Sequence, residues 1–223
     1  MAIDNESFEL LLSCVQRFVR ERLVPAEYAV EEHDEVPADI VADMKEMGLF
    51  GLSIPEDYGG IGLSMRQECR VACEVGQTAL AFRSVFGTTQ RILEESVAYA
   101  RERKQFGKRI GEFQVVQAML ADSQAELYAG WSMVRDCAQR YDAKPSISAS
   151  DPDVSMRASC CKLYCTEMAG RVADRGVQVH GGSGYINEYP VERFYRDVRL
   201  LRLYEGTTQI QQLIIGRELI GRE

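Results

Sequence analysis

The segment around Glu205 carries the residue types best suited to chemistry. From Tyr204 to Ile210 it sets one carboxylate beside a glycine and two threonines. A carboxylate in a dry pocket has its pKa raised by desolvation and can take a proton from carbon next to a carbonyl. Gly206 lets a ligand approach the backbone, and a threonine can cap a helix whose free N–H groups attract phosphate. Taken alone, the segment is more typical of a solvated loop before a helix.

Three further motifs precede this segment in the second half of the chain. They run Arg101-Glu102-Arg103-Lys104-Gln105-Phe106-Gly107-Lys108, then Gln178-Val179-His180-Gly181-Gly182-Ser183-Gly184-Tyr185, then Glu188-Tyr189-Pro190-Val191-Glu192-Arg193 with Arg196-Asp197. Their order and spacing resemble the C-terminal helical domain of the flavin-dependent acyl-CoA dehydrogenases. Residues 54–64 and 81–85 resemble the N-terminal helical domain of the same family. The resemblance covers nearly the whole chain.

The resemblance implies a role for each matching residue. Glu205 matches the proton-abstracting base and Gly206 a substrate contact. Arg103 and Gln114 match positions that hold the flavin dinucleotide (FAD) of a neighbouring subunit. Further FAD positions are matched by Gln178, Val179, His180, Gly181, Gly182, Thr207 and Gln209. An arginine fork suits phosphate because it pairs with two oxygens at once.

Two of the three motifs before the Glu205 segment have simpler interpretations from residue types alone. Arg103 with Phe106 and Gly107 is typical of a helix end with solvated charge. The glycines at 181, 182 and 184 are typical of a flexible helix terminus. They do not form a dinucleotide-binding Gly-x-Gly-x-x-Gly motif, because the spacing differs and no strand precedes them.

The resemblance has one gap. Family members carry a β-rich domain between the two helical domains, whereas here the N-terminal pattern runs through residues 86–89 straight into residues 90–95. In relatives the absent domain supplies much of the pocket wall around the flavin and part of the acyl-CoA site. The sequence is therefore consistent with two functions. One is an acyl-CoA dehydrogenase that passes electrons to an electron-transfer flavoprotein; the other is a catalytically impaired or non-catalytic helical assembly protein.

Composition and charge restrict the class of protein. The 223 residues are 46% apolar and 27% charged, which is ordinary for a soluble chain long enough to bury a core. A formal net charge of -8 argues against nucleic-acid binding, although the basic run over residues 101–109 could meet a cofactor pyrophosphate. No run approaches the ~18 apolar residues of a membrane span, and the first residues show no leader pattern. We expect a cytoplasmic protein that forms a homodimer or homotetramer.

Cysteine usage gives little support for a metal site. The seven cysteines stand at positions 14, 69, 73, 137, 160, 161 and 165. Two pairs have helical i,i+4 spacing, but neither has a histidine or further cysteine at a zinc-site interval. We expect no metal site and reduced, partly buried thiols.

Hydrophobic periodicity predicts helices throughout. One apolar stripe runs from Phe8 to Leu23 and is expected to end at Pro25; a shorter one over residues 38–49 stops at Gly48. Ser64 and Gln67 form a capping box before another helix. Longer helices are predicted over residues 92–106, 112–141, 155–180, 190–200 and 208–219, with a proline-containing linker at 144–152. These patterns predict an all-α fold, with an N-terminal helical domain at residues 1–89 and a C-terminal four-helix bundle at 90–223.

Overall fold

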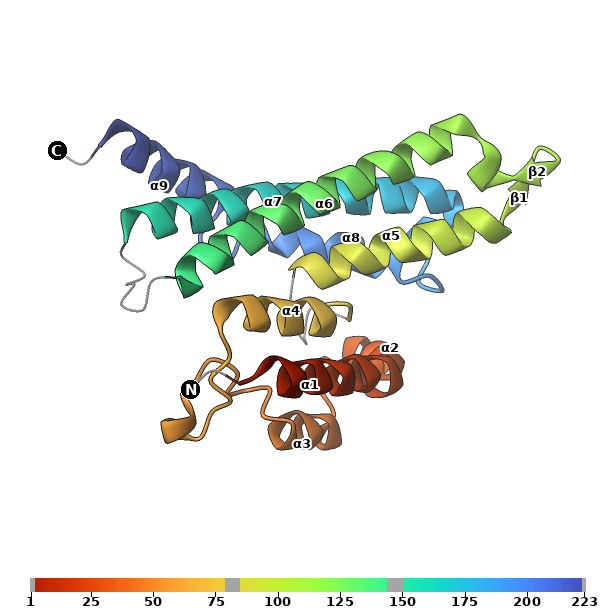
Figure 1. Cartoon of the computed structure of the whole chain (residues 1–223). Helices are drawn as coiled ribbons and strands as arrows, with labels where there is room; N and C mark the ends of the chain where they lie inside the picture. Colours follow the sequence, from red (N-terminus) through yellow and green to blue (C-terminus); the bar gives the residue numbers. More distant parts are fainter. Residues whose placement is uncertain (1–2, 79–84, 144–150, 222–223) are drawn as a thin grey trace.

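A computed structural model describes residues 3–78, 85–143 and 151–221, and arranges their helices in two layers (Figure 1). The N-terminal layer contains α1 (Asn5–Phe18), the π-helix η1 (Val19–Leu23), α2 (Val24–His33), α3 (Ala38–Glu46), η2 (Glu56–Tyr58) and α4 (Met65–Val75). The second layer contains α5 (Val85–Glu102), the strands β1 (Lys104–Gln105) and β2 (Lys108–Arg109), η4 (Ile110–Glu112), α6 (Gln114–Asp142), α7 (Pro152–His180), η5 (Gly181–Tyr185), α8 (Val191–Leu200) and α9 (Thr208–Ile220).

The predicted all-α class is confirmed, with one small addition. The helix expected to reach residue 106 instead begins at Val85 and ends at Glu102, and an antiparallel hairpin follows it. Phe106 and Gly107 form the hairpin turn with φ of 53° and 81°. Two consecutive left-handed residues match the twist of a tight hairpin and cannot continue an α-helix. In the described residues, β1 and β2 are the whole of the strand content.

The prediction that the first helix ends at Pro25 is wrong. The chain remains helical from Asn5 to His33, because the π-helical segment Val19–Leu23 connects α1 to α2. The backbone N–H of Val24 donates to the carbonyl oxygen of Val19, five residues back. Pro25 therefore lies in the first turn of α2, where a missing N–H is tolerated.

The local signal for the start of α4 is confirmed. The backbone N–H of Gln67 donates to Ser64 Oγ, and the backbone N–H of Ser64 donates to Gln67 Oε1, which completes the capping box. In the loop, a Cβ on Gly60 would lie 2.0 Å from the carbonyl oxygen of Ile54, so a larger residue does not fit there. The predicted linker falls mostly on residues 144–150, outside the described residues.

Each layer has its own hydrophobic core. Buried side chains of the N-terminal layer come from α1 to α4 and include Phe8, Val15, Leu23 and Val71. Those of the second layer gather along α7 and include Ile92, Met168, Val172, Phe194 and Leu201. The predicted domain division between residues 89 and 90 falls within α5, and the division itself stays a prediction.

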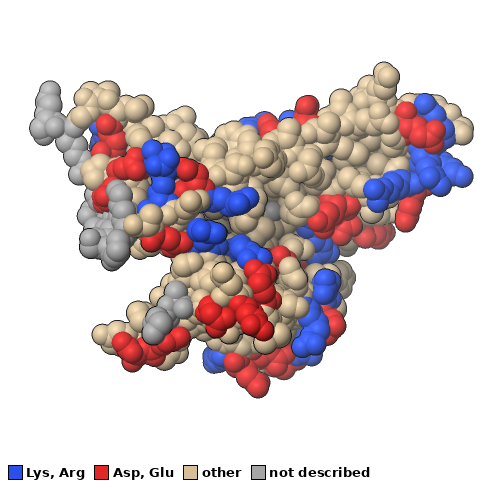
Figure 2. Space-filling view, in the orientation of Figure 1, with Lys and Arg blue, Asp and Glu red and all other residues tan. Residues whose placement is uncertain are grey.

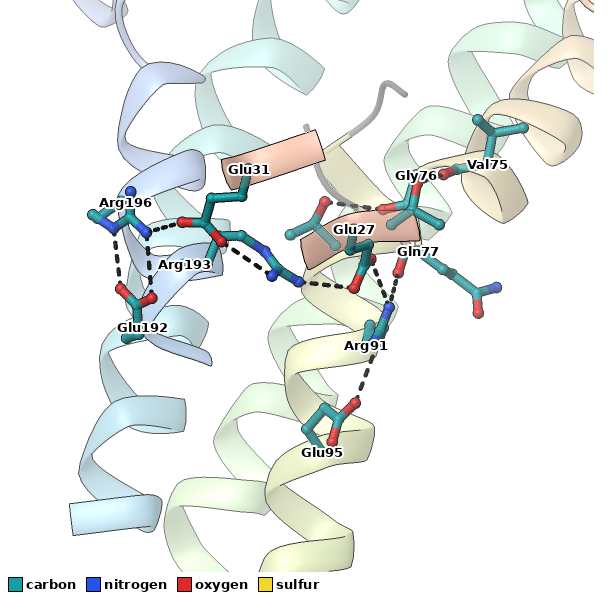
Figure 3. Close-up of polar contacts among 12 residues, drawn as sticks. Glu27, Glu31, Val75, Gly76, Gln77, Arg91, Glu95, Glu192, Arg193 and Arg196 are labelled. Carbon is teal, nitrogen blue, oxygen red and sulfur yellow. Dashed lines mark hydrogen bonds and ion pairs between the residues drawn. The ribbon is translucent and has the colours of Figure 1, made fainter. Parts of the chain in front are cut away.

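Buried ion pairs join the two layers (Figure 3). Glu27 on α2 has only 4% of its surface exposed and accepts from Arg91 on α5 and from Arg193 on α8, both at 2.8 Å. Glu31, one turn further along α2, pairs with Arg193 at 3.2 Å and with Arg196. The arginines of the Glu188–Arg196 region of the sequence therefore hold α2 against the long helices.

No helix in the described part of the chain is both long enough and apolar enough to cross a bilayer.

Candidate functional site

The turn that carries Glu205 lies between α8 and α9 and is fixed by side chains from two helices. Lys162 on α7 donates from Nζ to the carbonyl oxygens of Leu201 at 2.9 Å and Gly206 at 2.7 Å. Gln211 on α9 donates from Nε2 to the carbonyl oxygens of Glu205 and Gly206, both at 3.3 Å. These four hydrogen bonds hold the backbone on both sides of the Glu205 side chain.

The backbone of this turn adopts a left-handed conformation at two consecutive residues. φ is 53° at Glu205 and 88° at Gly206. Left-handed backbone is uncommon for a residue with a side chain, and such outliers gather at functional sites. A Cβ at position 206 would lie 2.7 Å from Gln211 Nε2, so a larger residue would have to displace that side chain and also adopt a left-handed backbone. Among the described residues, the backbone N–H groups of Glu205 and Gly206 have no hydrogen-bond acceptor.

The start of α9 is held by its threonines. Thr207 is the N-cap, and its Oγ1 accepts from the backbone N–H of Ile210 at 3.4 Å. Thr208 Oγ1 donates to Glu167 Oε1 at 2.8 Å, and Arg202 donates to the other oxygen of Glu167 at 3.1 Å. The capping role predicted for a threonine is therefore confirmed for Thr207, while Thr208 ties α9 to α7.

Charge and exposure distinguish the two ionisable groups of the turn. Burial lowers the pKa of Lys162, and the nearby carboxylates of Glu205 and Glu167 offset that effect only in part. Glu205 itself is exposed, as is Gln209, whereas Gly206 and Thr207 are partly buried. The chain therefore positions the Glu205 backbone firmly and leaves its carboxylate open to solvent, without the dry pocket that a strong base requires.

The second group of predicted residues lies at the C-terminal end of α7. Gln178, Gly181 and Gly182 are exposed, while the side chains of Val179 and His180 are buried. A Cβ on Gly181 or Gly182 would meet no atom within 4 Å, so the space beside this backbone is open. A ligand at this end of α7 would reach the Gln178 side chain and the glycine backbone.

His180 is part of an aromatic cluster beneath that backbone. Its ring stacks on Tyr99 of α5, with ring centroids 4.4 Å apart, and meets the edge of Tyr189 at 5.7 Å. Burial lowers the pKa of His180, against the opposing effects of the Gly176 carbonyl and Glu95. A neutral imidazole at this position supports the turn and contributes no charge.

Arg103 and Gln114 flank the hairpin at the same end of the long helices. Both are exposed, and within the described part of the chain the Arg103 guanidinium forms no ion pair. Figure 2 shows basic side chains gathered on this projection, interspersed with acidic ones. The exposed lysines and arginines there are Arg101, Arg103, Lys104, Lys108 and Arg109. An exposed cationic fork of this kind suits a phosphate or pyrophosphate.

The predicted residues therefore form two groups. Glu205, Gly206, Thr207 and Gln209 lie together beside Lys162 of α7. The other group, residues 178–182, begins 16 positions after Lys162 along the chain. At the 1.5 Å rise of an α-helix, the two groups are about 24 Å apart along the helix axis. The β1–β2 hairpin, which Arg103 and Gln114 flank in the sequence, lies at the same end of the long helices as the second group (Figure 1).

The residues that anchor the Glu205 turn did not emerge from the sequence. Lys162 is 44 positions from Gly206, and Glu167 is 41 positions from Thr208. Both lie within the long helix predicted over residues 155–180, where a charged residue is typical of the solvent-exposed face. The sequence signal for Gln211 is its place one turn into the helix, from which a glutamine can bond back to the preceding loop, and only the structure shows that it is buried.

A cavity of about 640 Å³ opens between α1, α4 and α6 and is lined by Phe8, Arg70, Trp131 and Arg135 among others. It contains none of the predicted site residues. Among the described residues, no group of three or more His, Cys, Asp or Glu side chains is placed to hold a metal ion.

Comparison with known protein families adds a direct observation. The sequence profile of the acyl-CoA dehydrogenase C-terminal domain matches residues 71–220, and that of the N-terminal domain matches residues 5–105. The chain belongs to the acyl-CoA dehydrogenase family. Because the two profiles overlap, no stretch remains between them for the middle domain of the acyl-CoA dehydrogenases, and its predicted absence is confirmed.

Individual acyl-CoA dehydrogenase relatives match over part of their length. The chain is 42% identical over 149 residues to the caffeyl-CoA reductase-Etf complex subunit CarC of Acetobacterium woodii, covering 67% of this chain and 37% of CarC. It is 35% identical over 164 residues to the acryloyl-CoA reductase (NADH) of Anaerotignum propionicum, covering 73% and 39%. The chain thus spans well under half the length of these curated relatives.

A solved acyl-CoA dehydrogenase has the same local fold. The structure from Geobacillus kaustophilus is 31% identical, with a TM-score of 0.57, over 70% of this chain and 37% of that one. The chain is thus an acyl-CoA dehydrogenase-type protein without the middle domain.

Proposed function

We propose that this chain acts as an FAD-dependent acyl-CoA dehydrogenase in which Glu205 removes the α-proton of an acyl-CoA thioester. The observation that carries the proposal is the backbone of the Glu205 turn. A left-handed glutamate is fixed on both sides by Lys162 and Gln211. Within the described part of the chain its carboxylate forms no hydrogen bond or ion pair, and the positive charge of Lys162 lies nearby. Conformational strain maintained by so many contacts is typical of a group held ready for chemistry.

The substrate carbonyl must be polarised for this step. A thioester α-proton is far too weakly acidic for a carboxylate of pKa about 4, so hydrogen-bond donors must stabilise the developing oxyanion. This chain offers the unpaired N–H groups of Glu205 and Gly206 and the positive end of the α9 dipole. Gly206, which has no side chain, lets the thioester approach them.

The predicted cofactor residues fit a dinucleotide. The unpaired Arg103 guanidinium suits the pyrophosphate, and the open backbone at Gly181 and Gly182 permits close approach by a flat or polar ligand. Gln178, Thr207 and Gln209 add neutral hydrogen-bonding groups. When bound, the flavin would accept the hydride that leaves the β-carbon of the substrate.

The separation of the two groups supports a site shared between two subunits. One group holds Glu205, Thr207 and Gln209; the other, about 24 Å away along α7, holds Arg103, Gln114 and residues 178–182. In this proposal, the hairpin group of one copy completes the cofactor site that the Glu205 group of its partner begins. A homodimer or homotetramer is then necessary for flavin binding.

We further propose that reduced flavin passes its electrons to an electron-transfer flavoprotein in the cytoplasm. The name of the relative CarC, a subunit of a caffeyl-CoA reductase-Etf complex, supports a partner of this class. Two of the relatives are named as CoA-thioester reductases, which makes reduction the alternative direction for a chain of this family.

A second function has its own supporting observation. Glu205 is exposed, and the domain that walls the flavin pocket in relatives is absent. These two facts favour a catalytically impaired or non-catalytic helical protein that assembles with itself or with full-length relatives. In that case the Glu205 turn would keep its ancestral geometry without its reaction.

Absorbance spectroscopy on the purified chain separates the two functions. A catalytic chain is expected to be yellow, with a flavin band that bleaches when acyl-CoA thioesters are added without oxygen. A chain that remains colourless after incubation with FAD would contradict the enzyme proposal and favour assembly. A yellow chain that no acyl-CoA bleaches would support cofactor binding and rule out dehydrogenation of the thioesters tested.

A further inference from the structure

The cavity between α1, α4 and α6 lies outside the proposed catalytic site. α4 lies between α1 and α6 (Figure 1), and the cavity volume of about 640 Å³ is within the roughly 300–1,000 Å³ of typical ligand pockets. A second cavity of about 350 Å³ adjoins it, because Arg70 and Trp131 line both. None of the residues predicted to hold flavin or acyl-CoA lines either cavity, so a ligand there would be additional to the proposed function.

Positive charge dominates the wall of the larger cavity. Among the described residues, its three arginines are Arg66 and Arg70 on α4 and Arg135 on α6, whereas Asp142 is its one carboxylate. Asp142 is already occupied, because it accepts from the backbone N–H groups of Met65 at 2.8 Å and Arg66 at 3.1 Å. An anion is therefore the kind of ligand that this wall attracts.

Two of the three guanidiniums have no carboxylate partner in the part of the chain that the structure describes. Arg70 donates from Nη1 and Nη2 to the two oxygens of Glu9, at 2.5 and 3.0 Å, and its Cζ lies 4.9 Å from the centre of the Phe8 ring. Arg66 and Arg135 are exposed, and no described side chain engages either guanidinium. A guanidinium fork pairs with two oxygens of a phosphate, so these two arginines are the available anion donors.

An aromatic side chain lines the same cavity. Trp131 on α6 is half-buried and precedes Arg135 by one helical turn, so both lie on one face of the helix. An indole gives a flat apolar surface on which another aromatic ring stacks. Asn5, at the start of α1, adds an amide side chain that has no partner among the described residues, and an amide suits hydroxyl groups or ring nitrogens.

We propose that this cavity binds a nucleoside phosphate, with the base against Trp131 and the phosphate between Arg66 and Arg135. The wall matches the three parts of such a molecule, which are a flat ring, a polar sugar and an anion. Inorganic phosphate would use only the arginines, and a nucleoside only the indole and Asn5, so neither should bind as tightly as the whole. Because exposed arginines supply the charge, binding should weaken as salt is added.

Tryptophan fluorescence of the full chain tests the proposal, because Trp131 is the only tryptophan in the sequence. Adenosine monophosphate (AMP) is the probe, with excitation beyond the absorption of adenine. Titration with AMP should quench the Trp131 emission, and isothermal titration calorimetry should give the same dissociation constant. Adenosine and inorganic phosphate should each bind at least about tenfold more weakly, because each lacks one set of contacts.

Arginine variants separate this cavity from the proposed flavin site. Arg66→Met and Arg135→Met should each weaken AMP binding about tenfold, because each removes a charge-assisted hydrogen bond. Arg199→Met is the matched control, since Arg199 is an exposed arginine of α8 that lines neither cavity, and it should leave AMP binding unchanged. Arg103→Met, at a position assigned to the flavin dinucleotide, should also leave it unchanged. All four arginines are exposed, and circular dichroism should show each variant folded like wild type.

Four results would overturn the proposal. One is a folded wild-type chain whose Trp131 emission and calorimetric heat do not change at millimolar AMP. Another is wild-type AMP affinity in the double variant that combines Arg66→Met with Arg135→Met. The third is loss of AMP binding in Arg103→Met, which would place the nucleotide at the hairpin. The fourth is inorganic phosphate that binds as tightly as AMP, because the base would then contribute nothing.

Discussion

Glu205 combines an unfavourable backbone conformation with an unpaired carboxylate. A left-handed residue other than glycine costs about 1 kcal/mol, and here Lys162 and Gln211 stabilise the neighbouring carbonyls enough to maintain it. A solvated loop glutamate needs no such support. The residue-scale geometry therefore favours a functional origin for the turn, whether or not the present chain completes the reaction.

Glu205→Gln tests the base directly. Where wild type shows flavin bleaching by acyl-CoA, we expect this variant to bind flavin normally and to bleach about 10²–10⁴-fold more slowly, because the amide lacks a basic oxygen. Stopped-flow absorbance measures the rate. Glu188→Gln is the matched control, since Glu188 is an exposed glutamate in the loop before α8. Equal rates of flavin bleaching in wild type and Glu205→Gln would show that Glu205 is not the base.

Among the elements, α7 does the most to organise the site. Its Lys162 and Glu167 hold the turn and the start of α9, and its C-terminal end presents Gln178 and the glycine backbone. The second hydrophobic core also gathers along it. The geometry of the Glu205 turn thus depends on how α7 packs against α8 and α9, more than on the turn sequence alone.

Lys162→Met should loosen this turn. The change removes the donor to Leu201 and Gly206 while keeping an unbranched chain of similar length, so we expect the free energy of unfolding to fall by about 1–2 kcal/mol. Amide hydrogen exchange over residues 201–208 should become faster, and exchange in α6 should not. Lys104→Met, an exposed change on β1, provides the comparison and should alter neither measurement.

At the scale of the whole molecule, buried charge joins the two layers. Arg193 bridges Glu27 and Glu31 and has only 11% of its side chain exposed, while Glu27 has 6%. Removing one member of such a group leaves a buried charge poorly compensated. The stability of the layer junction therefore depends on a few long-range pairs.

Arg193→Met should destabilise the protein by about 3 kcal/mol, because the buried Glu27 carboxylate then loses the ion pair with Arg193. Urea unfolding measures the change. The matched control is Arg22→Met, whose ion pairs with Asp39 and Asp43 are exposed to solvent and should contribute much less to stability. Similar losses in both variants would show that the junction is not the stronger interaction.

The junction should also respond to acid. Burial alone would raise the pKa of Glu31, but hydrogen bonds from Arg196 and Arg193 outweigh it and hold the pKa below its usual value of 4.5. A lowered carboxylate pKa stabilises the fold above the unfolded value and loses that contribution as pH falls through the folded value. Urea midpoints should therefore drop from pH 5 to pH 3, and by less in Glu31→Gln. An identical drop in both proteins would contradict this account.

Self-assembly is the remaining whole-molecule prediction. The exposed apolar side chains on α9 include Ile210, Leu213, Leu219 and Ile220, and the absent middle domain no longer covers the helices. Contiguous apolar surface favours association, so we expect a dimer or larger species by sedimentation at micromolar concentration. A purely monomeric species would also argue against the shared cofactor site.

The sequence by itself determined what depends on neighbours a few residues apart. The Ser64 and Gln67 capping box, the helical periodicity, the Thr207 cap and the ordered motifs that identify the family could all be read from it, as could the missing β-rich region. The capping box, the periodicity and the Thr207 cap reflect hydrogen bonds or side-chain spacing within about one helical turn, whereas the family motifs are recognised by their order along the chain. Local chemistry is visible in the linear chain.

Only the tertiary structure decided how those elements meet. It placed Lys162 on a turn 44 positions away, paired Glu27 with Arg193 across 166 positions, and left the Glu205 carboxylate exposed. It also carried the first helix past Pro25 through a π-helical segment. Such contacts depend on the packing of whole helices, which fixes the partners of a charged side chain only once both cores have formed.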